Sequence, residues 1–320
     1  MTLSVANPSP LPAAPPLLQC TTTTSSTAPA APEGLFPLHT LTADEKHSVQ
    51  SLQTQTAAIF KSSPLLLTGT PLPGEEQWAT SNDTALRYLK ACKFNVGKAY
   101  TMVLRSLQWR REYRPTEITP KDVEEESRNG KMFWSGFDRA GRPIFNLDAS
   151  KVKSTDTDRY LKLIVFNLER GVALCPGGVY QLTTVADVSN VTLFNQNPVS
   201  VSVQTLSILQ AHYPERLGCT VVLDPSWTLW ALWAVLSPFI DSGTRSKIYF
   251  TNSKKGSGGD KKKTQQQQVE DSHAVGTGGW LDSVDTLIDP SQLAVSMGGS
   301  YSYVYDHASY WKEAMKYLWK

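Results

Sequence analysis

Residues 213–250 constrain the fold more than any other part of the chain. This stretch reads YPERLGCTVVLDPSWTLWALWAVLSPFIDSGTRSKIYF, and no charged residue lies between Pro225 and Ile240. Residues 220–223 and 247–250 are rich in β-branched and aromatic residues, which predicts two buried strands. The apolar segment between them predicts a helix. A strand, a crossover helix and a second strand make a βαβ unit with parallel strands. We therefore expect an α/β fold whose crossover helix is far more apolar than covering one sheet face requires.

Residues 219–240 are 22 residues long, which is enough for a membrane-spanning helix. However, Asp224 lies inside the segment, and Pro225 and Pro238 would each interrupt a helix. The β-branched residues at its start also favour a strand. A strand followed by a helix in a soluble domain is therefore the better interpretation, with a transmembrane segment as the lesser alternative.

Four motifs, in this order, resemble the CRAL-TRIO lipid-binding family, and in particular its fungal proteins of the phosphatidylinositol-transfer type. LRYLKACKF at 86–94 is similar to the family's LRFLRARKF helix, and FDRAGRPI at 137–144 is similar to its DxxGRPV hairpin. The stretch at 213–250 contains the YPERL turn, the PFID exit and the TRSKI strand, and residues 290–299 resemble the closing LPxxxGG. Together the motifs cover roughly residues 80–310.

The resemblance implies an α/β fold with a helical N-terminal domain, followed by a CRAL-TRIO domain in which helices flank a mixed sheet and enclose a lipid cavity. It implies a protein that binds a single phospholipid, phosphatidylinositol or similar, and transfers or presents it between membranes. Carriage of a sterol or terpenoid and a lipid-sensing adaptor remain alternatives, and a lipid esterase is a remote third. No Gly-x-Ser-x-Gly elbow occurs, so we expect no enzyme and no catalytic residues.

Composition narrows the partners. A net charge of +2 gives no reason to expect nucleic acid. The cysteines at 20, 92, 175 and 219 lack metal-type spacing, so no metal and no cofactor are expected apart from the bound phospholipid. The N-terminus has no basic region, and its apolar patch at 11–18 contains three prolines. We expect a cytoplasmic, peripherally membrane-associated protein that contacts a membrane surface transiently, with a lipid kinase or another protein as an open possibility.

The chain divides by composition into successive parts. Residues 1–37 hold many prolines and one charge, which predicts a disordered tail. A helical domain is expected over 38–120 and the lipid-binding domain over 121–310. The latter has a low-complexity Gly, Lys and Gln loop inserted at 252–279, and a C-terminal helix is expected at 311–320.

Periodicity and turn residues predict the elements within these parts. Thr42 and Asn95 are expected to cap helices, residues 63–79 read as a Pro/Gly linker, and a hairpin joins 134–137 to 144–147. A further strand is expected at 182–188. Helices are expected at 38–62, twice within 83–114, at 158–174, 200–211 and 280–288, and in the tail after Tyr301.

The resemblance also implies a headgroup site. Glu215, Thr244 and Lys247 match the family's inositol-binding positions, where an ammonium and a hydroxyl can bind phosphate and a carboxylate can accept from hydroxyls. Cys92 stands where the family has an arginine and cannot replace its charge, so Lys93 is the expected substitute. From spacing alone, Glu215 could equally form a structural ion pair with Arg216 or Lys247.

The apolar helix matches the family's gate over the lipid cavity. Its candidate residues are Trp227, Trp230, Trp233 and Phe239, and the three tryptophans are expected to share a broad face. Tryptophan favours membrane interfaces, although an aromatic stripe is more commonly plain core. Thr192 and Phe194 are weaker candidates for the pocket wall. The lysines at 254, 255, 261, 262 and 263 would attract anionic lipid if they lie near a membrane, and otherwise form a solvated loop.

Overall fold

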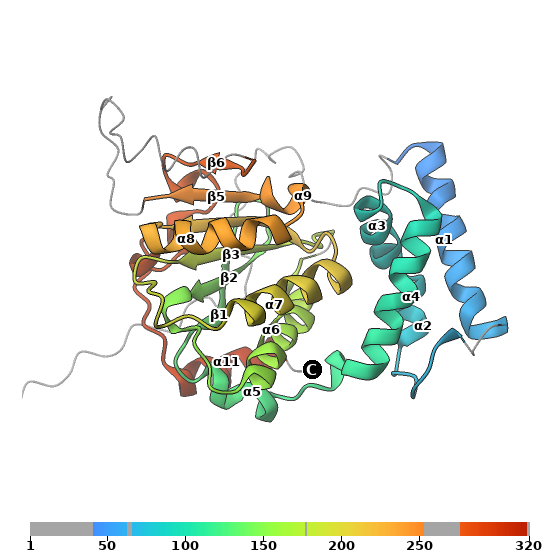
Figure 1. Cartoon of the computed structure of the whole chain (residues 1–320), viewed down its shortest axis with the longest axis horizontal. Helices are drawn as coiled ribbons and strands as arrows, with labels where there is room; N and C mark the ends of the chain where they lie inside the picture. The colour runs from blue at the N-terminus through green and yellow to red at the C-terminus, as the bar shows by residue number, and fades with distance from the viewer. Residues whose placement is uncertain (1–40, 63–65, 177, 253–275, 319–320) are drawn as a thin grey trace, which may run out of the picture.

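The computed structural model describes residues 41–62, 66–176, 178–252 and 276–318. These residues form a helical unit near the N-terminus and an α/β unit built on one sheet (Figure 1). The predicted tail at 1–37 and most of the predicted insertion, with its lysines at 254–263, lie outside the described residues.

The helical unit forms because capping residues and apolar spacing agree. Thr42 and Glu45 make a reciprocal capping box at the start of the first helix, with bonds of 2.9 and 3.2 Å. Ser81 and Asn95 accept backbone N–H groups at the starts of two others. Leu52, Leu89 and other apolar side chains form one buried cluster between the helices. The helices are α1 (Ala43–Ser62), α2 (Glu75–Thr80), α3 (Asn82–Ala91) and α4 (Val96–Tyr113).

The α/β unit contains a six-stranded mixed sheet with the order β1-β2-β3-β4-β5-β6. β1 and β2 form the predicted antiparallel hairpin, and all later neighbours are parallel. The pairing of β4 with β5 confirms the βαβ unit. The strands are β1 (Met132–Phe137), β2 (Pro143–Asp148), β3 (Leu182–Asp187), β4 (Leu217–Leu223), β5 (Ile248–Thr251) and β6 (Gly279–Trp280).

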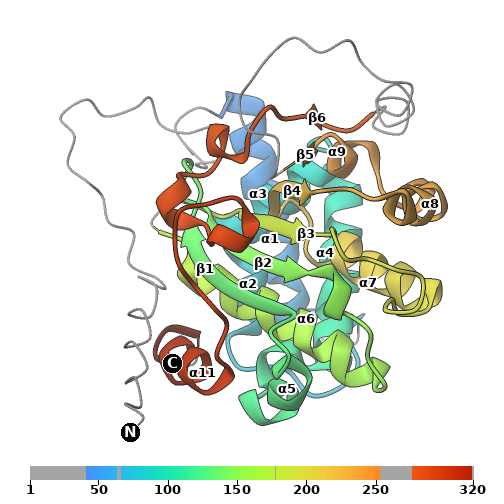
Figure 2. The ribbon, with the colours of Figure 1, turned by 90° about the vertical axis from the view of Figure 1, so that its left-hand side faces the viewer.

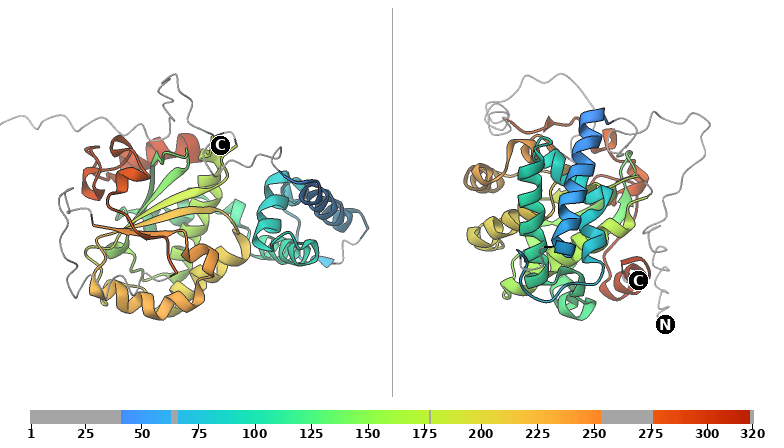
Figure 3. Two further views of the ribbon diagram at one scale, coloured as in Figure 1. Left: turned by 90° about the horizontal axis from the view of Figure 1, so that it is seen from above. Right: turned by 90° about the vertical axis from the view of Figure 1, so that its right-hand side faces the viewer.

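Helices cover one face of the sheet, and the stretch after β6 crosses the other (Figures 2 and 3). On the helical face lie α6 (Thr157–Gly171), α7 (Val199–His212) and α8 (Trp227–Leu236). The other α-helices in the described part of the chain are α5 (Pro120–Ser127), α9 (Ser242–Arg245) and α11 (His307–Leu318). Single 3₁₀ turns occupy Pro115–Glu117, Ala149–Lys151, Val172–Leu174, Ser237–Phe239, Val284–Thr286, Pro290–Gln292 and Val295–Met297.

The closing motif packs tightly against the edge strand β1. Gly136 has φ +76°, and a Cβ there would lie 2.3 Å from the carbonyl oxygen of Gln292. Tyr310 of α11 accepts the backbone N–H of Trp134 at 3.0 Å. The otherwise unpaired edge of the sheet is therefore covered by the end of the chain.

Two predictions about local structure are wrong. The predicted linker at 63–79 contains the start of α2, which begins at Glu75 and is held by the buried Glu75–Arg111 ion pair of 2.6 Å. The predicted helix at 280–288 instead starts as β6 and contains only a 3₁₀ turn. Pairing with β5, which lies far away in sequence, decides that segment, and a local apolar pattern cannot report it.

Among the described residues, no helix combines the length and the apolar character needed to cross a bilayer. The segment 219–240 is divided between β4, α8 and a 3₁₀ turn, as the two prolines and Asp224 indicated.

Candidate functional site

The apolar helix α8 is anchored to the sheet by two of its tryptophans. Ser226 caps its start by accepting the N–H of Leu229 at 3.4 Å. The rings of Trp230 and Trp233 lie 4.8 and 5.9 Å from that of Phe250 on β5. Trp280 of β6 joins the same aromatic group. The helix therefore lies over the β4–β6 half of the sheet.

Trp227, the first residue of α8, does not share the face that contacts the sheet. Trp227 is 74% exposed, whereas Trp230 is 6% exposed. The expectation that all three share one broad face is thus wrong: Trp227 faces solvent, although its neighbour Thr228 is buried. Phe239 and Val235 are also about half exposed.

The neighbouring helix α7 has the same property as α8. It is rich in valine and leucine, yet Val201 is its only buried residue. The inward residues Leu209, Leu229 and Leu232 pack against the buried clusters but are themselves only half-buried. Two adjacent apolar helices thus cover the sheet without burying their side chains as a core does.

The weaker candidates for the pocket wall lie in the loop between β3 and α7. Thr192 is exposed and Phe194 is 86% exposed. Val191, which the sequence did not single out, belongs to the buried cluster of Trp230 instead. Thr192 and Phe194 are therefore exposed loop residues, on either side of the exposed Leu193.

Glu215 and Lys247 lie together at the amino ends of β4 and β5. Lys247 Nζ is 3.1 Å from Glu215 Oε2, and the side chains of Lys247 and Glu215 are 27% and 28% exposed. Both are therefore within reach of a ligand as well as of each other. The geometry brings together the two residues that the resemblance implied, and they form the ion pair that was the structural alternative.

Thr244, the third expected headgroup residue, lies in the short helix α9 just before Lys247. Its hydroxyl donates to Asp241 Oδ2 at 2.6 Å, and its N–H donates to Oδ1 at 2.8 Å. Burial alone would raise the pKa of Asp241, but these bonds lower it below its usual value. The hydroxyl oxygen of Thr244 can still accept a hydrogen bond while its proton is directed at Asp241.

The turn that carries Glu215 is held by helix α3. Arg216 binds Asp83 at 2.6 Å, and Arg87 donates to the carbonyl of Pro214 at 3.1 Å. Glu215 itself has φ +58°, a left-handed conformation that is unfavourable for a residue with a side chain. These contacts from α3 of the helical unit stabilise the turn, which contains the unfavourable backbone conformation of Glu215.

Cys92 and Lys93 lie at the end of α3, where the chain reverses. Cys92 is the C-cap, and Lys93 and Phe94 have φ of +50° and +58°. Lys93 is exposed. Lys90, in the last turn of α3, is electrostatically coupled to the Glu215 pair. Burial is the main cause that lowers its pKa below the usual value, Lys247 lowers it further, and Glu215 opposes the shift.

A buried polar network joins the helical unit to the α/β unit below this turn. Arg110 forms a bidentate pair with Glu169 at 2.7 and 3.1 Å, and Tyr213 donates to the same carboxylate at 2.8 Å. His212 stacks on Trp109 with ring centroids 4.2 Å apart. Burial and then Arg110 lower the pKa of His212 from 6.5 to about 4, so its ring is neutral in the folded protein.

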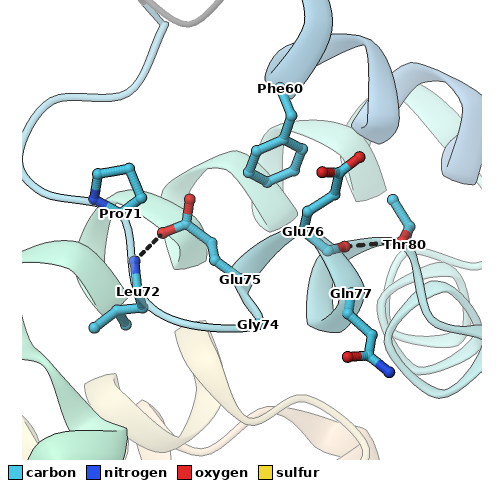
Figure 4. Close-up of a pocket in the computed structure, with 8 residues that line it drawn as sticks. All are labelled: Phe60, Pro71, Leu72, Gly74, Glu75, Glu76, Gln77 and Thr80. Atoms are coloured by element: carbon cyan, nitrogen blue, oxygen red, sulfur yellow. Dashed lines mark hydrogen bonds between the residues drawn. The ribbon is translucent and has the colours of Figure 1, made fainter.

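Two hollows lie away from α8. A small cavity of about 90 Å³ lies within the buried network, between Trp78, Arg110 and His212. A broader surface hollow of about 600 Å³ lies in the helical unit between the end of α1 and α2 (Figure 4). Its wall includes Phe60 and the carboxylates of Glu75 and Glu76, and Glu75 accepts the N–H of Leu72. Its acidic lining and distance from Lys247 separate it from the candidate headgroup site.

Within the described ranges, no group of three or more histidine, cysteine or carboxylate side chains is placed to hold a metal ion.

Comparison with known proteins gives two matching family models. The CRAL/TRIO domain model matches residues 127–299, and the CRAL/TRIO N-terminal domain model matches residues 47–104. The crystal structure of Sfh5 matches with a TM-score of 0.53 at 18% identity, over 65% of this chain and 80% of that one. This likeness shows a shared fold.

Three curated relatives illustrate the similarity. A CRAL-TRIO domain-containing protein of Schizosaccharomyces pombe is 28% identical over 76% of this chain and 21% of its own. Phosphatidylinositol transfer protein PDR17 of Saccharomyces cerevisiae is 26% identical over 77% of this chain and 65% of its own. Phosphatidylinositol/phosphatidylcholine transfer protein SFH4 of Arabidopsis thaliana is 29% identical over 53% of this chain and 31% of its own.

The chain spans no more than 65% of the length of these three relatives. The match to the domain model nevertheless covers more than half of the chain, and the predicted helical unit and mixed sheet both occur where the motifs indicated. The chain belongs to the CRAL/TRIO domain family.

Proposed function

We propose that the protein binds one phospholipid between the sheet and helices α7 and α8, and transfers it or presents it between membranes. The observation that carries this proposal is the incomplete burial of these two helices. α7 buries one residue of its fourteen, half of which are apolar, and α8 buries two of its ten, nine of which are apolar. An acyl chain lying against their inward faces would remove that surface from water at about 0.8 kcal/mol per methylene.

The polar edge at Glu215 and Lys247 supports a headgroup position in the same proposal. A lysine can bind the phosphate, a carboxylate can accept from inositol hydroxyls, and Thr244 can contribute its hydroxyl oxygen. The ion pair of 3.1 Å then holds both groups in place before the ligand arrives. The names of PDR17 and SFH4 as phosphatidylinositol transfer proteins agree with this choice of ligand.

No covalent step is part of this function. The work is to provide an apolar environment for acyl chains, whose passage through water is otherwise slow. Within the proposal, α8 moves to admit the lipid, and its exposed Trp227 and Phe239 contact the membrane surface when it does. A cytoplasmic protein that associates transiently with the membrane surface would fit this role. We also propose that residues 38–120 form the helical domain and residues 121–310 the lipid-binding domain.

A transfer assay tests the function. Purified protein is added to donor vesicles that carry fluorescent phosphatidylinositol or phosphatidylcholine, and the arrival of each lipid in acceptor vesicles is followed. We expect transfer of at least one of them at protein concentrations far below the lipid concentration. Absence of transfer and of any lipid co-purified from a eukaryotic host would remove the proposal.

A further inference from the structure

Helix α4 carries two outward cations, Lys98 and Arg105, that the fold does not use. Both are exposed, and because they are seven residues apart they share one side of the helix, about 10 Å apart along its axis. Within the described part of the chain, neither forms an ion pair with a carboxylate. By contrast, Arg110 and Arg111 of the same helix each pair with a glutamate, at 2.7 and 2.6 Å. Glu112, the one acidic residue of α4, lies two turns beyond Arg105.

This side of α4 adjoins the ends of α7 and α8. Ser106, next to Arg105, donates its hydroxyl to the carbonyl oxygen of Ala211 near the end of α7, at 3.1 Å. Gln210 of α7 donates to the carbonyl oxygen of Phe239 at 2.8 Å, in the 3₁₀ turn after α8. Both views of Figure 3 place α4 between α1 and the side of the molecule on which α7 and α8 lie. The two cations and the exposed end of α8 therefore belong to one side of the molecule.

The exposed apolar side chains of α8 and its exit turn lie on that side as well. They are Trp227, Val235 and Phe239, each about half exposed or more. Aromatic rings are stable at the interface between water and a bilayer, and lysine and arginine are attracted to the anionic lipids of such a surface. An acidic protein would match the cations but would leave these apolar side chains without a function. The combination therefore favours an anionic membrane as the partner.

We propose that Lys98 and Arg105 contact the anionic surface of a membrane and orient the protein so that the exposed end of α8 meets the bilayer. This inference rests on the proposed function and names the class of membrane on which the protein acts. The contact is made by the outside of α4 and does not include the candidate headgroup residues Glu215 and Lys247. Each cation should strengthen binding to anionic vesicles about fivefold, and the pair roughly thirtyfold.

The test compares two double variants of the full chain that remove the same charge. Lys98→Gln with Arg105→Gln removes the proposed contact. Lys61→Gln with Lys121→Gln removes two other exposed cations, at the end of α1 and in α5. Sedimentation measures binding to phosphatidylcholine vesicles with and without phosphatidylserine, at low and high salt. We expect the first variant to bind the phosphatidylserine vesicles roughly thirtyfold more weakly than the wild type, and the control to bind them as the wild type does.

Several results would overturn the contact. Equal losses in the two double variants would reflect net charge alone, and unchanged binding of the α4 variant would show that its cations take no part. Wild-type binding that is insensitive to both phosphatidylserine and salt would exclude an anionic surface. If polyglutamate binds the wild type but not the α4 variant, while vesicles bind both, the cations serve an acidic protein instead. If the α4 variant has a lower thermal midpoint, Lys98→Gln and Arg105→Gln are measured singly, with about fivefold weaker binding expected of each.

A transfer assay separates this contact from the proposed function. Between vesicles of phosphatidylcholine alone, the α4 variant should transfer fluorescent phosphatidylinositol at the wild-type rate, because no anionic surface is present. Between vesicles that contain phosphatidylserine, it should transfer more slowly than the wild type. Equal rates with both kinds of vesicle would overturn the contact and leave the proposed function intact. A wild type that binds phosphatidylserine vesicles through α4 but transfers no lipid would remove the proposed function and keep the contact.

Discussion

Helices α6 and α8 lie on the same face of the sheet but are built differently. α6 is amphipathic and buries eight of its fifteen residues, including Phe166, which is 1% exposed. α8 is apolar all round and buries only Thr228 and Trp230 of its ten. A single exposed apolar residue is ordinary in a folded protein, whereas a large exposed apolar patch is informative. The contrast agrees with the proposal that the apolar surface of α8 serves a ligand or a membrane, whereas that of α6 stabilises the fold.

The largest effect that can break this contrast concerns α6. Phe166→Ala should lower the free energy of unfolding by about 3–5 kcal/mol, because it leaves a cavity beside Trp311 in a closed core. Trp227→Ala is the matched large-to-small change in α8 and should stay within about 0.5 kcal/mol, since Trp227 is 74% exposed. Denaturant unfolding measures both. Similar losses at the two positions would show that α8 is ordinary core.

The second effect sharpens the contrast at the polar edge. Lys247→Ala and Glu215→Ala should each reduce phosphatidylinositol transfer about tenfold or more, since a charge-assisted contact contributes roughly 1.5–3 kcal/mol. Their partly exposed positions predict little change in unfolding, the reverse of Phe166→Ala. Transfer at the wild-type rate in both variants would return the pair to a purely structural role.

The third effect concerns local stability. Amide protons of α8 should exchange with solvent through a local opening that costs at least about 2 kcal/mol less than global unfolding, whereas those of α6 should require nearly the full amount. Native-state hydrogen exchange with peptide-level mass spectrometry separates the two helices. Addition of phospholipid vesicles should slow exchange in α8 and leave α6 unchanged. Equal protection of both helices without lipid would argue against a movable α8.

The smallest effect concerns α7, whose last residue is fixed although most of the helix is not buried. His212 has a pKa lowered to about 4, so the folded state binds its proton less readily than the unfolded state. Stability from this residue is complete above about pH 6.5 and is lost as the pH falls from 6.5 toward 4. We expect a loss on the order of 1–2 kcal/mol, reduced by the partial exposure of the ring. A matched pH series of unfolding with His212→Asn should lack this component.

Much of the fold could be predicted because its signals are local. The hairpin around Gly141, the caps at Thr42 and Asn95 and the strand–helix–strand unit each depend on residues close in sequence. β6 could not be predicted, since its two residues are fixed by pairing with β5, which lies some 30 residues earlier in the chain. The site divides in the same way. The motif predicted Glu215 and Lys247 as site residues, and the structure brings the two together, whereas the contacts by which α3 holds their turn depend on residues far apart in sequence.

Native mass spectrometry of the protein purified from a eukaryotic host tests the central claim most directly. The account predicts one phospholipid per chain in the native spectrum, released on denaturation and identifiable in the extract. Replacement of the inward Leu232 of α8 by Asp should lower the occupied fraction, while the same protein stays folded because that side chain is only half-buried. A native spectrum that contains only the mass of the chain, with no hydrophobic molecule in the extract, would contradict it.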